Sequence, residues 1–355
     1  MVPLDGPSDP IKAPVSQERR NDFRRAFFLM AAKRHCRGHA LSCFLDGSTD
    51  LIPRQARLRN AGTSPHANLV VNSSFRYEPH GAVPPDISNR PPPTDGLQQG
   101  SPLVWVETPG VGIWVPFSVR GEWSAISESL KAGQPAPSTL SAQARQRLMM
   151  AGVLGTSGYE ERERAQWEIT CREAGAQFRT YGYSLVRDVI PPMLIGALRG
   201  YYRALVAGGR LPLGDSQVAE RHRLHSEPVG MFFHPQLSSL VSRIAGEPVK
   251  PSYVYFSSYP SGSALPRHVD RLQCEFSISL LVDYVPDPDG PCGWPLFLEH
   301  PDLPGGVVDA DLGLGDVLLY RGRQLVHYRD PLPDGHQSSS IFLHYVRESF
   351  DGDTS

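Results

Sequence analysis

From Pro251 to Val346 the chain follows a two-residue period, and this pattern limits the fold more than any other feature of the sequence. Along the first extended segment one face carries Tyr253, Tyr255, Ser257 and Tyr259, and the other carries Val254 and Phe256. A second segment sets Phe276, Ile278, Leu280 and Val282 against Glu275, Ser277, Ser279 and Asp283. Further strands at 315–320, about 325–329 and 340–346 bring the total to roughly six to eight. So many antiparallel-looking strands predict a closed or sandwiched β-barrel.

Helical patterns come before this region and predict an α+β protein in which helices buttress the barrel. The best defined helix has Asp188 as a candidate cap and two prolines, Pro191 and Pro192, in its first turn. Its apolar stripe is Leu194, Ala197, Leu198, Tyr201 and Leu205. A solvated helix at 159–175, a short strand at 181–187 and a second helix at about 235–244 complete this part.

The residues before the barrel domain read as a mixed α/β extension. We expect a flexible tail at 1–20, an extension at 21–155 and a barrel domain at 156–355. The extension holds an amphipathic helix at about 20–43, strands near 103–106 and 112–117, helices at 123–133 and 141–151, and a long loop at 78–101. Its part at 103–154 loosely resembles the winged-helix modules that recognise peptides beside some peptide-modifying enzymes. The alternative is a structural extension packed on the catalytic domain.

Composition excludes several classes of protein. A formal charge of −2 and a pI near 6.6 give no reason to expect a nucleic-acid partner. The chain opens without a signal-like segment, and no apolar run approaches the ~20 residues of a membrane span. We therefore expect a cytoplasmic protein without a membrane partner. Five scattered cysteines predict reduced thiols, and the Cys36–Cys43 region lacks the paired spacing of a zinc site.

Three residues of the β region form a candidate metal-ligand set. His268 and Asp270 are two positions apart, so in a strand both point to the same face. His327 follows the predicted strand at 315–320 and precedes a turn. Two imidazoles and one carboxylate with open positions are the ligands of a non-haem Fe(II) oxygenase. Competing candidates for the distal ligand are His225, His234, His300, His336 and His344.

Two segments around these residues carry a family resemblance. They are Tyr259-Pro-Ser-Gly-Ser-Ala-Leu-Pro-Arg-His-Val-Asp and the run Gly315-Asp-Val-Leu-Leu-Tyr before His327. Together they resemble the Fe(II)/2-oxoglutarate-dependent oxygenase superfamily, in its prolyl hydroxylase-like branch, over about residues 176–347. The resemblance implies a double-stranded β-helix (jelly-roll or cupin-like) barrel. It also implies iron held by His268, Asp270 and His327, with 2-oxoglutarate and O2 as co-substrates and Tyr259 lining the 2-oxoglutarate pocket. The carboxylate at Asp270 favours hydroxylation over halogenation.

The chain departs from the family pattern in one place. Relatives place Arg or Lys nine to eleven residues after the distal histidine, whereas this chain has His336, Gln337 and Ser338. Because Arg329 is two residues beyond His327, it shares that face of the strand. A guanidinium binds a carboxylate bidentately, so Arg329, helped by Ser340, is the predicted 2-oxoglutarate anchor. Arg321 and Arg323 are the reserves, and the candidate pocket residues are Trp294, Arg271, Glu227 and His225.

The predicted function is hydroxylation of a C–H bond. The substrate is an amino acid residue in a peptide or protein, or a free amino acid or natural-product intermediate. One alternative is a non-catalytic barrel that binds a partner through its N-terminal region, which the missing cation after His327 supports. Another is a cupin-like metal enzyme that uses no 2-oxo acid. The sequence predicts no oligomeric state.

Overall fold

The computed structural model describes residues 43–354, except 46, 55, 57–67 and 86–100. The predicted tail at 1–20, the helix at about 20–43 and most of the loop at 78–101 lie outside the described residues. None of the helices in the described part of the chain combines the length and apolar character that a membrane span requires. Four described cysteines, at positions 43, 171, 274 and 292, are free thiols.

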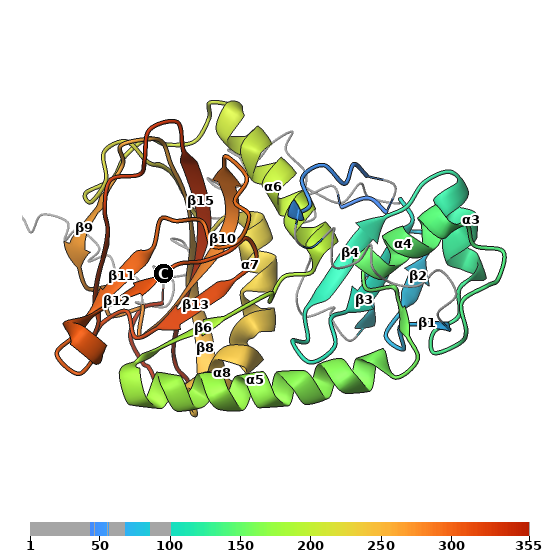
Figure 1. Ribbon diagram of the computed structural model, residues 1–355, viewed down its shortest axis with the longest axis horizontal. Helices are drawn as coiled ribbons and strands as arrows, with labels where there is room; N and C mark the ends of the chain where they lie inside the picture. Colours follow the sequence, from blue (N-terminus) through green and yellow to red (C-terminus); the bar gives the residue numbers. More distant parts are fainter. Residues whose placement is uncertain (1–42, 46, 55, 57–67, 86–100, 355) are drawn as a thin grey trace, which may run out of the picture.

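The C-terminal part is built on a six-stranded antiparallel sheet, drawn on the left of Figure 1. Its strand order is β6 (Tyr183–Val186), β13 (Val317–Tyr320), β10 (Phe276–Val285), β15 (Gln337–Arg347), β8 (Val249–Tyr259) and β7 (His222–His225). A four-stranded antiparallel sheet has the order β12 (Val307–Ala310), β11 (Leu296–Glu299), β14 (Val326–Arg329) and β9 (Leu265–His268). From β8 onward the chain passes repeatedly between the two sheets, so residues distant in sequence meet between them.

The two faces of the large sheet pack against different partners. Its outer face carries Val254, Phe256, Ile278, Leu280, Ile341 and Leu343, which share one core with the helices. These helices are α5 (Tyr159–Tyr181), α6 (Pro192–Ala207), α7 (Pro228–Phe233) and α8 (Ser238–Ala245), with a 3-10 turn at Pro235–Leu237 before α8. The inner face packs Tyr259, Leu281 and Tyr320 against Leu296 and Leu298 of the small sheet. The predicted alternation of Tyr253, Tyr255, Ser257 and Tyr259 therefore describes the face between the sheets.

A β-bulge corrects one sequence prediction. The pairing of β10 with β15 shifts between Leu281 and Asp283, so Asp283 leaves the face of Ser277 and Ser279. Its carboxylate instead accepts hydrogen bonds from Arg199 and Arg203 of α6, on the outer side. Strict alternation fails here because the bulge adds one residue to the strand.

Helix α6 also differs from prediction at its start. The residue before its first turn is Pro191, and Asp188 stands outside the helix with a φ of 54°, so Asp188 is not the cap. The sequence reading did not include β7 or α7. Glu227 caps α7 by accepting from the amides of Val229 and Gly230. This cap, together with Pro228 in the first turn, lets a six-residue helix form under the sheet.

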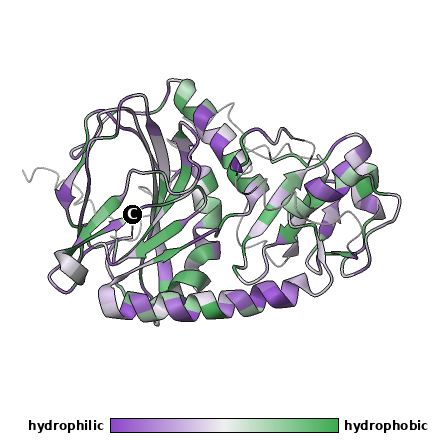
Figure 2. Ribbon diagram, in the orientation of Figure 1, coloured by the Kyte–Doolittle hydropathy of each residue, from purple (hydrophilic) through white to green (hydrophobic). Residues whose placement is uncertain are grey.

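The N-terminal part lies against the helical layer. It contains a two-stranded sheet of β1 (Leu69–Val71) and β5 (Leu154–Thr156), and a three-stranded sheet of β2 (Arg76–Glu78), β3 (Leu103–Glu107) and β4 (Trp114–Ser118). Helices α3 (Glu122–Ser129) and α4 (Ala142–Met150) complete it. Figure 1 shows α6 and α7 between this part and the sheets, with the 23-residue α5 running beneath both. Much of α5 is hydrophilic, as Figure 2 shows.

Contacts between the two parts involve the outer helices. The Trp105 ring packs edge-on against Phe232 of α7 at 6.4 Å, and the amide of Trp114 donates to Gln236. A cleft of about 850 Å³ lies between the parts, lined by residues such as Met149, Trp167 and Ile195. None of the candidate iron ligands lines this cleft. The described N-terminal residues therefore contact the side of the large sheet opposite the candidate site.

Candidate active site

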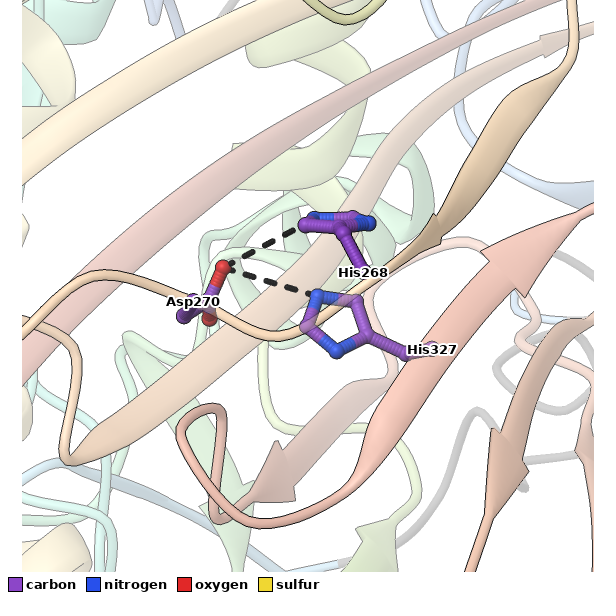
Figure 3. A group of neighbouring side chains, drawn as sticks. All are labelled: His268, Asp270 and His327. Carbon is purple, nitrogen blue, oxygen red and sulfur yellow. Dashed lines mark ion pairs between the residues drawn. The ribbon is translucent and has the colours of Figure 1, made fainter.

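Adjacent strands of the four-stranded sheet bring His268, Asp270 and His327 together. His268 ends β9 and pairs in register with His327 of β14, and Asp270 follows β9 at once. Asp270 Oδ1 lies 3.5 Å from His327 Nε2 and 3.8 Å from His268 Nε2. Dashed lines in Figure 3 mark these two contacts. The two imidazole rings are 4.2 Å apart. One ligand atom from each residue lies within 4.8 Å of the others, so a single metal ion can reach all three.

Backbone hydrogen bonds fix both imidazoles in the form that binds a metal. His268 Nδ1 lies 2.8 Å from the carbonyl oxygen of Pro266, and His327 Nδ1 lies 3.0 Å from that of Leu325. A carbonyl oxygen only accepts, so each Nδ1 donates a proton to it, and Nε2 is the ring nitrogen left to face a metal. Both Nε2 atoms point toward Asp270. This outer-shell arrangement is typical of metal-binding histidines.

The carboxylate of Asp270 is held by groups that the sequence reading did not single out. Ser277 Oγ donates to Oδ2 at 2.8 Å, which leaves Oδ1 facing the imidazoles. The Asp270 amide donates to the carbonyl oxygen of Gly322 at 2.8 Å. A Cβ added at Gly322 would overlap Asp270 Oδ2 and lie 2.7 Å from Ser277 Oγ. Position 322 therefore has room only for glycine, which no local sequence pattern indicates.

The electrostatic surroundings favour the protonation states of Asp270 and His268 that bind a metal ion. Burial acts to raise the pKa of Asp270, but the hydrogen bond and charge of His327, with smaller contributions from His344 and Ser277, hold it well below its usual range. Burial, followed by the charge of His327, lowers the pKa of His268. A carboxylate that stays ionised and an imidazole that stays neutral are the forms that bind a cation.

The competing histidines lie elsewhere or are otherwise engaged. His234 is buried on the outer face, where Nε2 donates to the carbonyl oxygen of His344. His300 lies beside Asp302, and the His336 ring lies 5.6 Å from that of Tyr284. His344 belongs to a second group with Asp270 and Cys274.

The second group is the weaker ligand set. His344 Nδ1 hydrogen-bonds Ser277 Oγ at 2.9 Å, and burial raises the pKa of Cys274 to about 12. A thiol with so high a pKa is protonated at neutral pH, whereas metal ligation requires the thiolate.

Arg329 is buried on the same face of β14 as His327. Its guanidinium donates to the carbonyl oxygen of Trp294 and lies 4.4 Å from the centroid of that indole ring. Burial lowers its pKa, although an arginine remains charged. Among the described residues no carboxylate lies within ion-pair distance of it, and Asp311 acts on it only from farther away. A buried cation without a paired anion lowers stability unless a bound ligand supplies a negative charge.

Tyr259 lies beside the same indole. Its ring packs edge-on against Trp294 at 5.2 Å, and its hydroxyl accepts from Arg221 at 2.7 Å. Having accepted that bond, the phenol keeps its own proton for another acceptor. Arg221, absent from the sequence prediction, also pairs with Asp215 at 2.6 Å. Arg221, Arg223 and His225 are spaced two residues apart, and this alternation is the signal that could have indicated an edge strand here.

The remaining predicted residues divide between the two faces. Ser340 is buried on the inner face and pairs in register with Ser257. The reserve cations lie away from the site: Arg321 covers the Phe178 ring at 5.1 Å, and Arg323 lies 3.7 Å from Glu275. Glu227, predicted as a pocket residue, is fully buried as the cap of α7 and accepts from two tyrosine hydroxyls. Glu227 is therefore not a pocket residue, and the side chains of Arg321 and Arg323 contact other groups.

Comparisons with known proteins give a distant likeness. No family model matches the chain, and no curated protein matches it. Solved structures similar to part of this chain include prolyl hydroxylases and a non-heme alpha ketoglutarate dependent epimerase.

Three of these structures illustrate the distance. A Pseudomonas putida prolyl-4-hydroxylase is 19% identical over 50% of this chain and 100% of its own, with a TM-score of 0.41. A Trichoplax adhaerens prolyl hydroxylase, in complex with a hypoxia inducible factor peptide fragment, is 17% identical over 52% and 93%, with a TM-score of 0.43. The epimerase SnoN from nogalamycin biosynthesis, in complex with Fe3+ and alpha ketoglutarate, is 16% identical over 51% and 84%, at 0.41. Likeness at this level does not assign a function, so the proposals below depend on the residues of the chain.

Proposed function

We propose that the protein is an Fe(II)/2-oxoglutarate-dependent oxygenase that hydroxylates a C–H bond. The observation that carries the proposal is the convergence of two imidazole Nε2 atoms and one carboxylate oxygen, which lie within 4.8 Å of one another. His268, Asp270 and His327 would hold the iron. Three ligands on one side leave the other coordination positions open to small molecules.

Polar groups near the ligands fit a 2-oxo acid. Buried hydroxyl groups of Ser257, Ser279 and Ser338 have no hydrogen-bond partner. All three lie on strands of the large sheet, and unpartnered buried hydroxyls are costly unless a ligand satisfies them. Arg329 adds the cation. Residues two apart in a strand are separated by ~6.6 Å, which suits a five-carbon diacid that reaches from the metal to Arg329.

The strand connections support a double-stranded β-helix as the scaffold. From β8 to β15 the order of sheets along the chain is large, small, large, small, small, large, small, large. Antiparallel strands wound in this way between two sheets form a jelly roll. Such winding places the two histidines of the ligand set, His268 on β9 and His327 on β14, on adjacent strands of the small sheet.

The residues of the candidate site would bind and orient the iron, the co-substrate and one another. When bound, Fe(II) with 2-oxoglutarate and O2 supplies the oxidising chemistry, which decarboxylates the co-substrate to succinate and places oxygen in a substrate C–H bond. The backbone carbonyls of Pro266 and Leu325 keep the protons of His268 and His327 on Nδ1. Ser277 orients Asp270, and Arg329 with Tyr259 binds and orients the distal carboxylate.

The wider assignments stay proposals. The barrel domain at 156–355 would be the catalytic unit, acting on an amino acid residue in a peptide or protein or on a smaller molecule. The winged-helix-like recognition role of the extension at 21–155 is likewise a proposal, and described residues of the extension contact α7 and the turn after it. A cytoplasmic location and the lack of a nucleic-acid partner are predictions from composition alone.

Anaerobic titration followed by addition of O2 tests the proposal. We expect Fe(II) and then 2-oxoglutarate to bind, and succinate to form when O2 is admitted, with Asp270→Ala as the inactive control. Iron binding without 2-oxoglutarate binding would favour the cupin-like alternative. Failure of the wild-type protein to bind either would favour the non-catalytic alternative.

A further inference from the structure

Four rings pack against one another beside the candidate iron ligands. The His225 ring stacks on Tyr253 at 4.8 Å and meets Tyr255 edge-on at 5.8 Å. The Tyr253 ring in turn lies 4.5 Å from that of His344, which hydrogen-bonds Ser277 and so reaches Asp270. Burial lowers the pKa of His225 to about 4, so this imidazole is neutral at pH 7. We call Tyr253, Tyr255, His225 and His344 the ring wall.

Arginines surround the ring wall. In the pairing of β7 with β8, Arg223 is opposite Ser257 and His225 is opposite Tyr255, so Arg223 shares the face of the wall. Arg271 follows Asp270 and begins the turn that its carbonyl closes with the amide of Cys274. Both guanidinium groups act electrostatically on His225. They therefore come to the ring wall from two different segments, β7 and the turn after Asp270.

The charges of these two arginines are not balanced locally. Arg271 is exposed and makes no ion pair or hydrogen bond with its side chain in the described part of the chain. Arg223 donates only to the carbonyl oxygen of Gly214. The nearby Asp215 is engaged by Arg221 and Tyr255, and Asp270 belongs to the ligand set. Exposed arginines that lack carboxylate partners at a pocket attract anions.

Apolar side chains stand at the same rim. Val269 and Leu272, which flank Asp270 and Arg271, are 48% and 59% exposed, and Leu213 beside β7 is 63% exposed. Large apolar residues exposed beside a pocket commonly mark a binding surface. This surface, which we call the rim, thus combines two arginines without carboxylate partners among the described residues, apolar side chains and flat rings.

We infer that the substrate carries a carboxylate, which Arg271 and Arg223 bind at the rim, and an apolar or planar portion that packs on the ring wall. The inference rests on the proposed oxygenase function and names the substrate class of that site. It favours a small acid, or a peptide presented by its C-terminal carboxylate, over a neutral internal peptide segment.

Matched acids and amides test the inference on the protein loaded with Fe(II) and saturating 2-oxoglutarate under anaerobic conditions. The probes are N-acetyl-L-leucine and N-acetyl-L-tyrosine, each beside its primary amide, with dissociation constants measured by calorimetry. We expect each acid to bind about tenfold more tightly than its amide, the effect of one charge-assisted contact. Arg271→Gln and Arg223→Gln should each reduce this ratio toward one.

The control variant is Arg267→Gln. Arg267 covers the Tyr328 ring at 4.2 Å and pairs with Glu299, so its loss should leave the ratio unchanged. Arg271 is exposed, and its replacement should not affect folding. Equal affinity of acid and amide, no binding of either, or a ratio that survives Arg271→Gln would overturn the inference while 2-oxoglutarate still binds. Loss of iron or 2-oxoglutarate binding in the wild type would instead defeat the proposed function and the inference with it.

Discussion

Replacing Arg329 by glutamine removes the buried guanidinium that we propose as the anchor of 2-oxoglutarate. In the protein this group is 3% exposed and lies over the Trp294 ring, with no carboxylate partner among the described residues. A bidentate contact with the distal carboxylate contributes two charge-assisted hydrogen bonds of roughly 1.5–3 kcal/mol each. Because glutamine keeps one neutral donor, we expect a net loss of about 3 kcal/mol. The dissociation constant of 2-oxoglutarate should therefore rise about 100-fold.

A ligand that lacks the distal carboxylate isolates this contact. 2-Oxopentanoate has the same chain length and the same 2-oxo acid head, so its affinity should be equal in the wild type and in Arg329→Gln. Arg329→Lys keeps the charge but loses the fork, and should fall between them. Arg321→Gln is the matched control, because Arg321 covers Phe178 on the outer side.

The assay is calorimetry on the anaerobic Fe(II)-loaded protein, with thermal unfolding of each variant measured in parallel. Removal of an unpaired buried charge should not lower the melting temperature. An unchanged 2-oxoglutarate affinity in Arg329→Gln would refute the assignment of the anchor. An equal loss for 2-oxopentanoate would show that the substitution damages the site in general.

Three further outcomes follow from the contacts. Gly322→Ala forces a methyl group against Asp270 and Ser277, so iron affinity measured by titration should fall at least tenfold, with retained affinity contradicting the geometry. Glu227→Ala leaves two amides and two tyrosine hydroxyls without this acceptor, and urea denaturation should show a loss of about 3 kcal/mol; a loss below about 1 kcal/mol would contradict the capping role. Burial lowers the pKa of His234 to about 3. Below about pH 6.5 this histidine is therefore protonated in the unfolded chain while it stays neutral in the folded chain. The free energy of unfolding should thus decrease as pH falls from 6.5 toward 4, by about 3 kcal/mol at most from this residue. His234→Gln should make this decrease smaller.

Sequence periodicity anticipated the face on which the candidate site lies. The two-residue alternation of Tyr253 to Tyr259 follows from strand geometry alone, and the pairing of β8 with β15 keeps a regular register from Val254 to Tyr259. The same geometry put His268 and Asp270 on one face, and Arg329 beside His327. These placements needed only local rules, which is why they could be predicted.

Other features depend on contacts that no local rule describes. Asp283 changed faces because of a bulge, which arises from pairing between two strands rather than from the sequence of one. Strand β7 is four residues long at a sheet edge, so its alternation was too short to recognise. Glu227 reads as a polar loop residue, and only the packing of Tyr201 and Tyr202 around it makes it a buried cap.

The N-terminal extension shows the same limit on a larger scale. Its strands at 103–107 and 114–118 were readable from alternation and their connecting turn. The sequence did not indicate where these strands would pack, because they could have packed against either face of the barrel domain. The contacts of Trp105 and Trp114 with α7 and the residues that follow it set that choice.

Iron stoichiometry in the wild type and in three single variants tests the central claim most directly. The protein is equilibrated anaerobically with Fe(II), freed of unbound metal and assayed for iron per chain. We predict one iron per wild-type chain, less than a tenth of that in His268→Ala, Asp270→Ala and His327→Ala, and a full equivalent in His300→Ala, whose imidazole lies outside the cluster. Wild-type protein without iron, or an Asp270→Ala variant that retains a full equivalent, would contradict the account.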